Sequence, residues 1–414
     1  MFIGIDDTDS EKGLCTTYLA AVLIDRLRGL GTLKGLPKLI RLNPCVQYKT
    51  RGNAAIAFEI ETERPDKVKD IALRTVLEFS DLSGANTNPG LIAADSISED
   101  LKRFYRRAVT EILEIQEARE ILDSDGIWYR GLKKGRGLIG ALAAIGADLE
   151  DHTYELVAYR ERSRWGTPRQ IDSDSVWKAD ALTYPKTWDT VDYHNDRIVF
   201  APHSGDPVLF GIRGEDIDAI ELAFQNIKSE PLEHRVLYIT NQGTDAHIQQ
   251  GEISHVRDNQ SYCLRGRISS TPKAIKGGHL FFSLENGSVL NCAAFEPTKN
   301  FRAVIKQLIP GDEVEVYGAI RDGTLNLEKL NILCLAEQKI LAAPNCPSCG
   351  RRMESAGKGQ GYRCKRCKTK AECCQHKSLP RELEAGFYEV PPCARRHLAK
   401  PLVRVAGENV HPSR

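Results

Sequence analysis

Residues 1–20, MFIGIDDTDSEKGLCTTYLA, begin with an apolar run that continues directly into three aspartates, Asp6, Asp7 and Asp9. Residues 13–17, Gly-Leu-Cys-Thr-Thr, have the composition of a turn that leads into a helix. The stretch therefore predicts a strand, an acidic loop and a helix start. Aspartate and serine favour turns and helix N-caps, which gives the loop an ordinary structural explanation. Carboxylates at the end of a strand also suit Mg²⁺ held against phosphates, which is the chemical alternative.

The chain after this stretch alternates between helical and strand-like segments. The apolar spacing predicts helices over 14–31, 65–80 and 95–122, and strands over 37–44 and 53–61. Alternation of this kind indicates an α/β or α+β domain over residues 1–122.

A second unit is predicted over residues 123–250. A glycine-rich loop at 133–137 leads into an Ala/Leu-rich helix, and a second, amphipathic helix is expected over 214–227. The expected strands span 153–160, 197–202, 207–214 and 234–241. This pattern is typical of a ferredoxin-like α+β layer.

Residues 251–338 have a different pattern, with short strands at close spacing. The expected strands span 261–270, 279–286, 288–296, 312–320 and 324–336, and a helix over 299–309 separates the third from the fourth. Five strands with a helix at that point indicate an OB-fold, a barrel that binds oligonucleotides. Another kind of small β-barrel is the alternative.

The last segment, residues 339–414, contains two CxxC pairs with 14 residues between them. The four thiols are those of Cys346, Cys349, Cys364 and Cys367. Such turns present four thiolates to one tetrahedral Zn²⁺, as in a zinc ribbon, and leave no open position for catalysis. Cys373, Cys374 and His376 are rival ligands, but their spacing is poor. We therefore predict one structural zinc.

The net charge of +1 conceals an asymmetry between the two ends of the chain. Residues 341–414 carry 15 Lys and Arg against 6 Asp and Glu, a net of +9, so that the preceding 340 residues have a net charge of −8. The bases around the CxxC pairs are Arg351, Arg352, Lys358, Arg363, Lys365, Arg366, Lys368 and Lys370. Their density predicts a surface for a nucleic-acid backbone; a solvated charge run is the simpler alternative.

Two cationic loops are candidates for phosphate binding. The first, in the segment 133–140, offers Lys134, Gly135, Arg136 and Gly137 at the start of a helix. The second lies between two predicted strands and offers Lys49, Arg51 and Asn53. The first loop lacks the spacing of a P-loop, so a packing role for its glycines is the alternative.

Composition places the chain among globular proteins, with 27% charged and 41% hydrophobic residues. No apolar run approaches the length of about 18 residues that a membrane span requires. The first residues predict a strand and lack the features of a signal peptide. A cytoplasmic protein is expected, with no membrane association and no obligate protein partner.

Several of these motifs, in this order, resemble those of the TiaS family, the archaeal tRNA(Ile) 2-agmatinylcytidine synthetases. The resemblance rests on the segments 4–10, 15–17, 43–44, 49–53, 88–90, 134–140 and 391–397 and on the CxxC pairs, so it covers essentially the whole chain. It implies a kinase-like N-terminal domain, a ferredoxin-like domain, an OB-fold and a zinc ribbon. The same division follows from the segment patterns above.

The resemblance also implies an activity. A TiaS enzyme uses ATP to attach agmatine to C2 of the wobble cytidine in a tRNA(Ile) with a CAU anticodon. ATP is cleaved to AMP, and the γ-phosphate activates the C2 oxygen that the agmatine amine then displaces. Thr16 corresponds to the family's autophosphorylated threonine. Asp6, Asp7 and Asp9 are then the expected Mg²⁺ ligands, with one of them a base toward Thr16, and ATP, Mg²⁺ and structural Zn²⁺ are the expected cofactors.

Two other classes of function compete with this one. A non-catalytic tRNA-binding module would use the barrel and the ribbon, but it leaves the acidic loop and the segment 133–140 unexplained. A nucleic-acid ligase would need a nucleophilic lysine in a KxDG motif. Neither the lysine at 49 nor that at 134 is followed by the aspartate of that motif.

Overall fold

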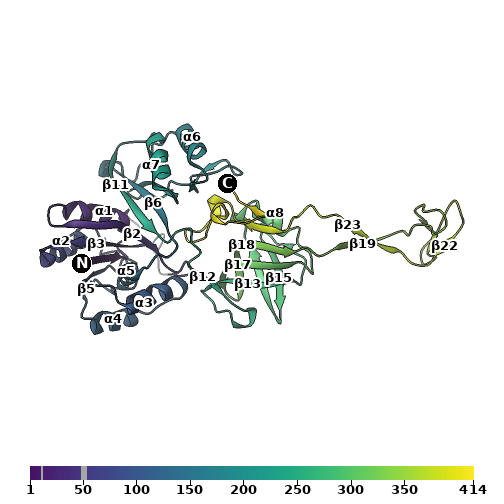
Figure 1. Ribbon diagram of the computed structural model, residues 1–414, viewed down its shortest axis with the longest axis horizontal. Helices are drawn as coiled ribbons and strands as arrows, with labels where there is room; N and C mark the ends of the chain where they lie inside the picture. Colours follow the sequence, from purple (N-terminus) through teal and green to yellow (C-terminus); the bar gives the residue numbers. More distant parts are fainter. Residues whose placement is uncertain (11–12, 48–53) are drawn as a thin grey trace.

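The computed structural model describes residues 1–10, 13–47 and 54–414. The molecule is elongated: an α/β half lies at one end, a β-barrel lies in the middle, and a small finger extends on a two-stranded stalk (Figure 1). Within these ranges, no helix is long and apolar enough to cross a lipid bilayer.

One nine-stranded sheet forms the framework of the α/β half, in the order β5-β4-β1-β3-β2-β11-β6-β10-β7. The strands are β1 (Phe2–Asp6), β2 (Thr32–Arg41), β3 (Ala54–Glu61), β4 (Gly90–Ala94), β5 (Trp128–Gly131), β6 (Thr153–Arg160), β7 (Thr187–Trp188), β10 (Val208–Gly214) and β11 (Leu232–Thr240). Strands β2 and β11 pair in parallel at Lys38–Ile239 and Leu39–Thr240. The sheet therefore continues across the expected boundary at residue 122.

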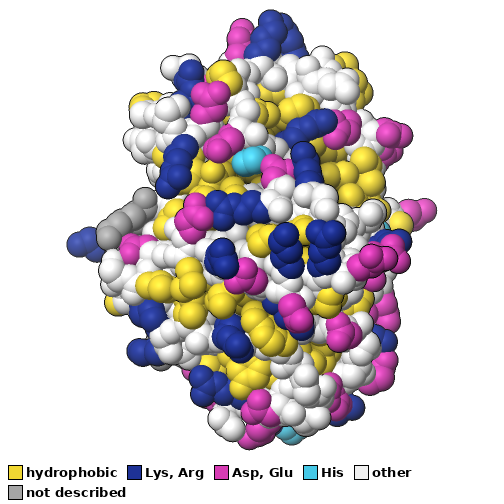
Figure 2. Space-filling view, turned by 90° about the vertical axis from the view of Figure 1, so that its left-hand side faces the viewer, with side chains coloured by type: hydrophobic (Ala, Val, Ile, Leu, Met, Phe, Trp, Pro, Cys, Tyr) yellow, Lys and Arg dark blue, Asp and Glu magenta, His cyan; other side chains and the backbone are white. Residues whose placement is uncertain are grey.

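Helices cover both faces of this sheet. One face carries α1 (Thr16–Arg26) and α2 (Pro65–Glu78), which pack on Ile3 and Ile5 of β1. The other face carries α3 (Glu99–Thr110), α4 (Ile115–Ser124) and α5 (Gly137–Gly146). On the same face, α6 (Ser173–Thr183) and α7 (Ile217–Asn226) cover β6 and β10. On the outer surface of this half, cationic, acidic and apolar side chains are interspersed (Figure 2).

The structure corrects one sequence-based expectation in this half and adds one helix that was not expected. The single helix predicted over 95–122 is wrong, because α3 ends at Thr110 and α4 begins at Ile115. A capping box starts the second helix, since the Glu117 carboxylate accepts a hydrogen bond from the Glu114 backbone N–H at 3.2 Å. Helix α6 was not predicted; its N-terminus is capped by Asp172.

The middle of the molecule is a closed five-stranded barrel, and its strands lie where their spacing predicted them. Its strands are β13 (Ser261–Ile268), β15 (Leu280–Asn286), β16 (Ser288–Ala294), β17 (Glu313–Arg321) and β18 (Thr324–Cys334). The ring closes because β13 pairs with both β15 and β17, β18 pairs with both β16 and β17, and β15 pairs with β16. The predicted helix between β16 and β17 is present as the short α8 (Phe301–Ile305).

The finger is the CxxC segment, at the end of a stalk formed by β19 (Gln338–Ala342) and β23 (Gln375–Leu379). Three two-residue strands form its sheet: β20 (Glu354–Ser355), β21 (Tyr362–Arg363) and β22 (Lys370–Ala371). Figure 1 shows it far from the α/β half. The cations around the CxxC pairs are therefore concentrated at one end of the molecule.

The chain then returns to the body, which changes the expected picture of a basic tail. Strand β24 (Gly386–Glu389) pairs with β18 of the barrel, and β25 (Val410–His411) pairs with β24. Arg395 forms ion pairs with Asp189 of the α/β half and with Glu389 of its own segment, and Arg404 pairs with Asp151 of the α/β half at 2.8 Å. The arginines of this returning segment, residues 384–414, thus neutralise acidic groups of the body.

A buried charge cluster joins the barrel to the α/β half. The Glu328 carboxylate of β18 lies 3.0 Å from His247 Nε2 and 3.0 Å from Arg396 Nη1 of the returning segment. His247 is fully buried. Burial alone would raise the pKa of Glu328, but the charges of Arg396 and His247 outweigh it and lower the pKa to about 2.

We expect Glu328→Gln to lower the free energy of unfolding by about 3 kcal/mol at neutral pH, because it leaves the buried His247 ring and the Arg396 guanidinium without their carboxylate partner. The folded pKa lies below the unfolded value of about 4.3, so this contribution is complete above about pH 4.3 and is lost as the pH falls toward 2. Unfolding of both proteins across this pH range measures it. The control is Glu337→Gln, which breaks a half-exposed pair with Lys339 and should lower the free energy of unfolding much less, because solvent screens an exposed pair. Equal losses in both variants would contradict this account.

Candidate active site

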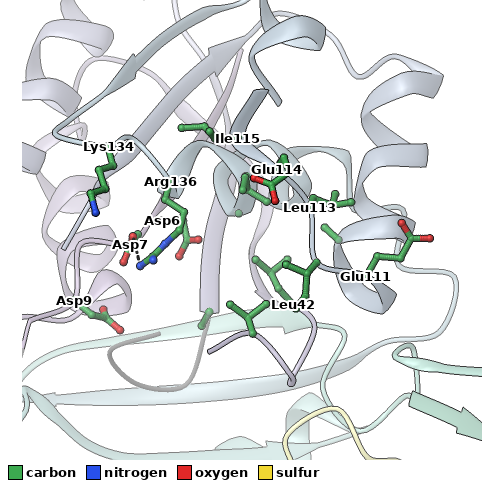
Figure 3. A pocket seen from close by; sticks show the side chains of 16 residues that line it. Asp6, Asp7, Asp9, Leu42, Glu111, Leu113, Glu114, Ile115, Lys134 and Arg136 are labelled. Atoms are coloured by element: carbon green, nitrogen blue, oxygen red, sulfur yellow. Dashed lines mark hydrogen bonds and ion pairs between the residues drawn. The ribbon is translucent and has the colours of Figure 1, made fainter. Parts of the chain in front are cut away.

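A cavity of about 270 Å³ opens at the edge of the sheet where β1 ends and β3 and β4 begin. Its charged lining consists of five carboxylates, those of Asp6, Asp7, Asp9, Glu111 and Glu114, and two cations, Lys134 and Arg136 (Figure 3). Its apolar lining includes Leu42, Val46, Leu113, Ile115 and Ile139. The acidic loop and the glycine-rich loop, far apart in sequence, thus face one space. We call this the first cavity.

Glycines allow these two loops to approach each other. A Cβ atom at Gly140 would overlap the Asp6 carboxylate, and one at Gly137 would overlap the Asp6 carbonyl oxygen. Gly135 has a φ of +65°, which a larger residue rarely adopts. The packing explanation of the loop is therefore correct for its glycines. It also places the cations of the same loop, Lys134 and Arg136, in the cavity wall.

Arg136 connects the basic loop to the acidic one. Its Nη2 donates to Asp7 Oδ2 at 3.1 Å (Figure 3) and to the carbonyl oxygen of Asn86 at 3.3 Å. Burial raises the pKa of Asp7 to about 6, although the Arg136 charge acts in the opposite direction. Burial and the neighbouring Asp7 charge also raise the pKa of Asp6 well above its usual range. Two adjacent, buried carboxylates of this kind favour a bound cation.

Asp9 has a different environment from its neighbours, because it holds the first residue of α1. Its Oδ1 accepts hydrogen bonds from the Thr16 backbone N–H at 2.5 Å and from the Thr16 hydroxyl at 2.9 Å. The Thr8 hydroxyl in turn donates to Thr16 Oγ1 at 2.9 Å. Asp9 is thus a helix cap, as its residue type allows, and also a proton acceptor beside a hydroxyl.

The three aspartates do not converge on one point. Of the described residues, only the four cysteines of the CxxC pairs bring three or more ligand atoms within mutual reach. Arg136 holds Asp7 and Thr16 holds Asp9, which keeps them apart. Mg²⁺ in nucleotide sites is bound by only one or two carboxylates together with phosphates and water, and Asp6 with Asp7 fits that requirement.

A second cavity, of about 580 Å³, lies on the other side of Asp9. Thr16, Thr17 and Arg41 line it together with Glu155, Asp189, Asp206, Arg213, Cys393 and Arg395. Sequence reasoning did not predict this cavity, because its walls come from α1, β2, β6, β10, the loops near residues 189 and 206, and the returning segment. The sequence signals that fall on it are Asp9, Thr16 and the segment 391–397, which contributes Cys393 and Arg395.

Charges of both signs alternate along the second cavity. Arg213 Nε donates to Glu155 Oε1 at 3.2 Å, and its Nη1 lies 3.7 Å from Asp189. Asp189 also pairs with Arg395, which pairs with Glu389 at 2.8 Å. Such a lining suits a ligand that carries both cationic and anionic groups.

The remaining predicted site residues fall into two groups. The sulfur atoms of Cys346, Cys349, Cys364 and Cys367 lie within 4.8 Å of one another, which suits one tetrahedral metal ion. The rival ligands Cys373, Cys374 and His376 are not members of this cluster. Lys49, Arg51 and Asn53, predicted to bind phosphate, lie outside the described residues.

Comparisons with known proteins give one consistent family. Three family models match: the TiaS TCKD domain over residues 2–134, the TiaS FLD domain over 135–247 and the TiaS C-terminal zinc ribbon domain over 343–383. The tRNA(Ile) 2-agmatinylcytidine synthetase TiaS of Methanosarcina acetivorans is 47% identical over 428 residues, with all of both chains covered.

Two solved structures extend this likeness to the whole fold. The structure of a complex of TiaS with its isoleucine tRNA and ATP matches with a TM-score of 0.93 and 46% identity. The structure of a complex of TiaS with the same tRNA, AMPCPP and agmatine matches with a TM-score of 0.90 and 43% identity. Each comparison covers 100% of this chain and 99% of the other.

Proposed function

The chain belongs to the TiaS family, and from this premise we propose that it attaches agmatine to C2 of the wobble cytidine in tRNA(Ile) in an ATP-dependent reaction. One observation carries the proposal: Thr16 and Asp9 form a hydroxyl–carboxylate pair where two cavities meet. The first cavity suits a nucleoside triphosphate, and the second cavity suits agmatine and the wobble cytidine. A binding module without catalysis would leave this pair unused.

The first cavity is the proposed ATP site. Its apolar wall, with Leu42, Leu113 and Ile115, suits an adenine base, while Lys134 and Arg136 supply charge for phosphates. Asp6 and Asp7 would hold Mg²⁺, which when bound neutralises the phosphates and aligns them for transfer. The raised pKa values of both carboxylates support this assignment, since burial is their main cause and a bound cation would offset the cost of burying the two charges.

Thr16 is the proposed first acceptor of the γ-phosphate, with Asp9 as its base. The hydroxyl donates to Asp9 Oδ1 at 2.9 Å, which is within the distance for proton transfer. Thr16 also begins α1, where the helix dipole favours a phosphate group. In the proposed sequence ADP leaves as Thr16 takes the γ-phosphoryl group, and this group then activates the C2 oxygen of cytidine and departs with that oxygen as phosphate when the agmatine amine displaces it. A separate hydrolysis of the β-phosphate of ADP by water accounts for AMP as the final product.

The second cavity is the proposed site for agmatine and the wobble cytidine. Glu155, Asp189 and Asp206 offer carboxylates to a guanidinium or ammonium group, and the arginines beside them suit the RNA backbone. A base inside a stacked anticodon loop cannot reach Thr16, so the cytidine must be turned out into this space.

The rest of the molecule is proposed to hold the tRNA. We assign the barrel, within residues 251–338, as an OB-fold, the unit 123–250 as ferredoxin-like, and residues 1–122 as the kinase-like unit. The four cysteines would hold one structural zinc in the finger, within residues 339–414, and the cations around them would contact phosphates. A tRNA substrate agrees with the cytoplasmic location expected from the sequence.

Mass spectrometry of the wobble nucleoside tests this function. The protein is incubated with ATP, Mg²⁺, agmatine and a transcript of the tRNA(Ile) that has a CAU anticodon, and the tRNA is then digested to nucleosides. We expect a cytidine heavier by the mass of agmatine less one water, in reactions that contain both ATP and agmatine. A transcript with uridine at the wobble position is the matched control. Unmodified cytidine in the complete reaction would refute the proposal.

A further inference from the structure

Arg41 stands where the two cavities meet. It ends β2 and lies opposite Ala54 of β3, a residue that lines both cavities. On the other side of β3, Asp6 ends β1. Neighbouring strands lie about 4.8 Å apart, so the backbones of Arg41 and Asp6 are separated by about 10 Å.

The side chains of Arg41 and Asp6 point to opposite faces of the sheet. Asp6 contacts the start of α5, on the face that carries the first cavity. Arg41 has the same orientation as Leu39, which packs in the cluster with α1, because side chains two apart in a strand share a face. Arg41 therefore lines the second cavity with Thr16. A phosphoryl group that moves from the first cavity to Thr16 must cross this edge of the sheet.

The guanidinium of Arg41 is held in place and charged. Its Nε donates to Gln242 Oε1 at 3.2 Å, and its backbone N–H donates to Asn241 Oδ1 at 2.8 Å. Burial lowers the pKa of Arg41 to about 10, with the Glu155 and Asp9 carboxylates acting against that shift. The side chain is therefore cationic at neutral pH, and it lies in the second cavity, on the same face of the sheet as Thr16.

We propose that Arg41 is a catalytic residue that binds the phosphoryl group as it passes from ATP to Thr16. The inference rests on the proposed function. In this step a bond forms between Thr16 Oγ1 and the γ-phosphorus, and the bond from that phosphorus to its bridging oxygen breaks. The electron pair leaves with the nucleoside diphosphate, and the hydroxyl proton passes to Asp9. Arg41 takes no part in bond changes; it stabilises the charge of the transferred group.

The test uses ATP labelled in its γ-phosphate, with Mg²⁺ and the full chain in the absence of tRNA. We expect Arg41→Ala to slow the labelling of Thr16 by at least about 100-fold, the effect of removing one donor to a developing charge. The affinity for ATP should change by less than about threefold, because Arg41 is outside the first cavity. Arg41→Lys should retain part of the rate. Arg74→Ala, which removes an exposed arginine of α2, is the matched control and should label like the wild type.

Rescue with guanidinium separates catalysis from structure. Free guanidinium, at a concentration that leaves the wild type unaffected, should restore labelling in Arg41→Ala but not in Arg41→Lys, whose side chain fills the space. Normal labelling in Arg41→Ala would overturn the proposal. A loss of labelling together with an equal loss of ATP affinity and no rescue would also overturn it. If Arg41→Ala labels normally but binds tRNA more weakly, Arg41 contacts an RNA phosphate instead. A wild type that modifies tRNA without labelling Thr16 would overturn this inference and leave the proposed function intact.

Discussion

Asp7→Asn is expected to reduce both ATP turnover and agmatine transfer by at least about 1,000-fold, while the melting temperature changes by less than about 2 °C. The loss of activity follows from charge, since an amide is a poor ligand for Mg²⁺ beside phosphates. The retained fold follows from two local features. Asp7 has a φ of 56°, a conformation that asparagine also adopts readily. The Asn carbonyl oxygen also keeps the position of Asp7 Oδ2, so Arg136 can still donate to it.

ATP consumption, transfer of labelled agmatine to tRNA and thermal unfolding together measure this prediction. The matched control is Asp66→Asn, which removes an exposed carboxylate from the first turn of α2 and should leave activity unchanged. If activity and fold were lost together in Asp7→Asn, the acidic loop would be a structural feature only. Full activity would remove Asp7 from the metal site.

The part of the fold that sequence predicts best is the part with local signals. Strand β1, the acidic loop and α1 follow from an apolar run, turn residues and helical spacing within one short segment. The barrel strands follow from their regular spacing, and the cysteine cluster follows from two short motifs. In each case the residues that decide the structure are neighbours in sequence, so the pattern itself carries the information.

Other features depend on contacts that a pattern does not contain. The break between α3 and α4 comes from the capping box at Glu114 and Glu117, inside a segment whose apolar spacing continues without interruption. The net charge of +9 over residues 341–414 combines the cations of the finger with those of the returning segment. Arg395 and Arg404 neutralise acidic groups of the α/β half, and only the tertiary structure reveals these partners.

The candidate site likewise has features that the local sequence predicts and features that only the tertiary structure reveals. The sequence identified Asp6, Asp7 and Asp9 as one acidic group, but their roles differ because the second partner of each comes from a distant element. Arg136 holds Asp7, whereas Thr16 holds Asp9. The carboxylates of the second cavity that come from residues 123–250 have no local signal, since Glu155 and Asp189 belong to different strands and loops and are paired with arginines. Residue type therefore predicts the kind of chemistry, while topology decides which residue performs each step.

Cys364→Ser is expected to unfold the finger and abolish its metal binding, and to weaken tRNA binding by at least about tenfold. The finger has almost no apolar core: its buried residues are Cys346, Met353 and Cys364. A unit this small needs a metal for stability, and losing one of four thiolates removes a tetrahedral site. The eight cations around the cysteines would then lose their fixed positions against the RNA backbone.

The rest of the molecule should be unaffected, because in the described part of the chain the finger is joined to the barrel through its two-stranded stalk. The chain re-enters the barrel through β24, which pairs with β18 independently of the finger. We therefore expect Thr16 labelling without tRNA to stay within about twofold of the wild type. Metal analysis, tRNA titration and limited proteolysis measure the effect. Cys373→Ser, a change at an exposed cysteine outside the cluster, is the control and should keep the metal. A folded finger without metal, or unchanged tRNA affinity in Cys364→Ser, would show that the finger neither needs zinc nor binds the tRNA.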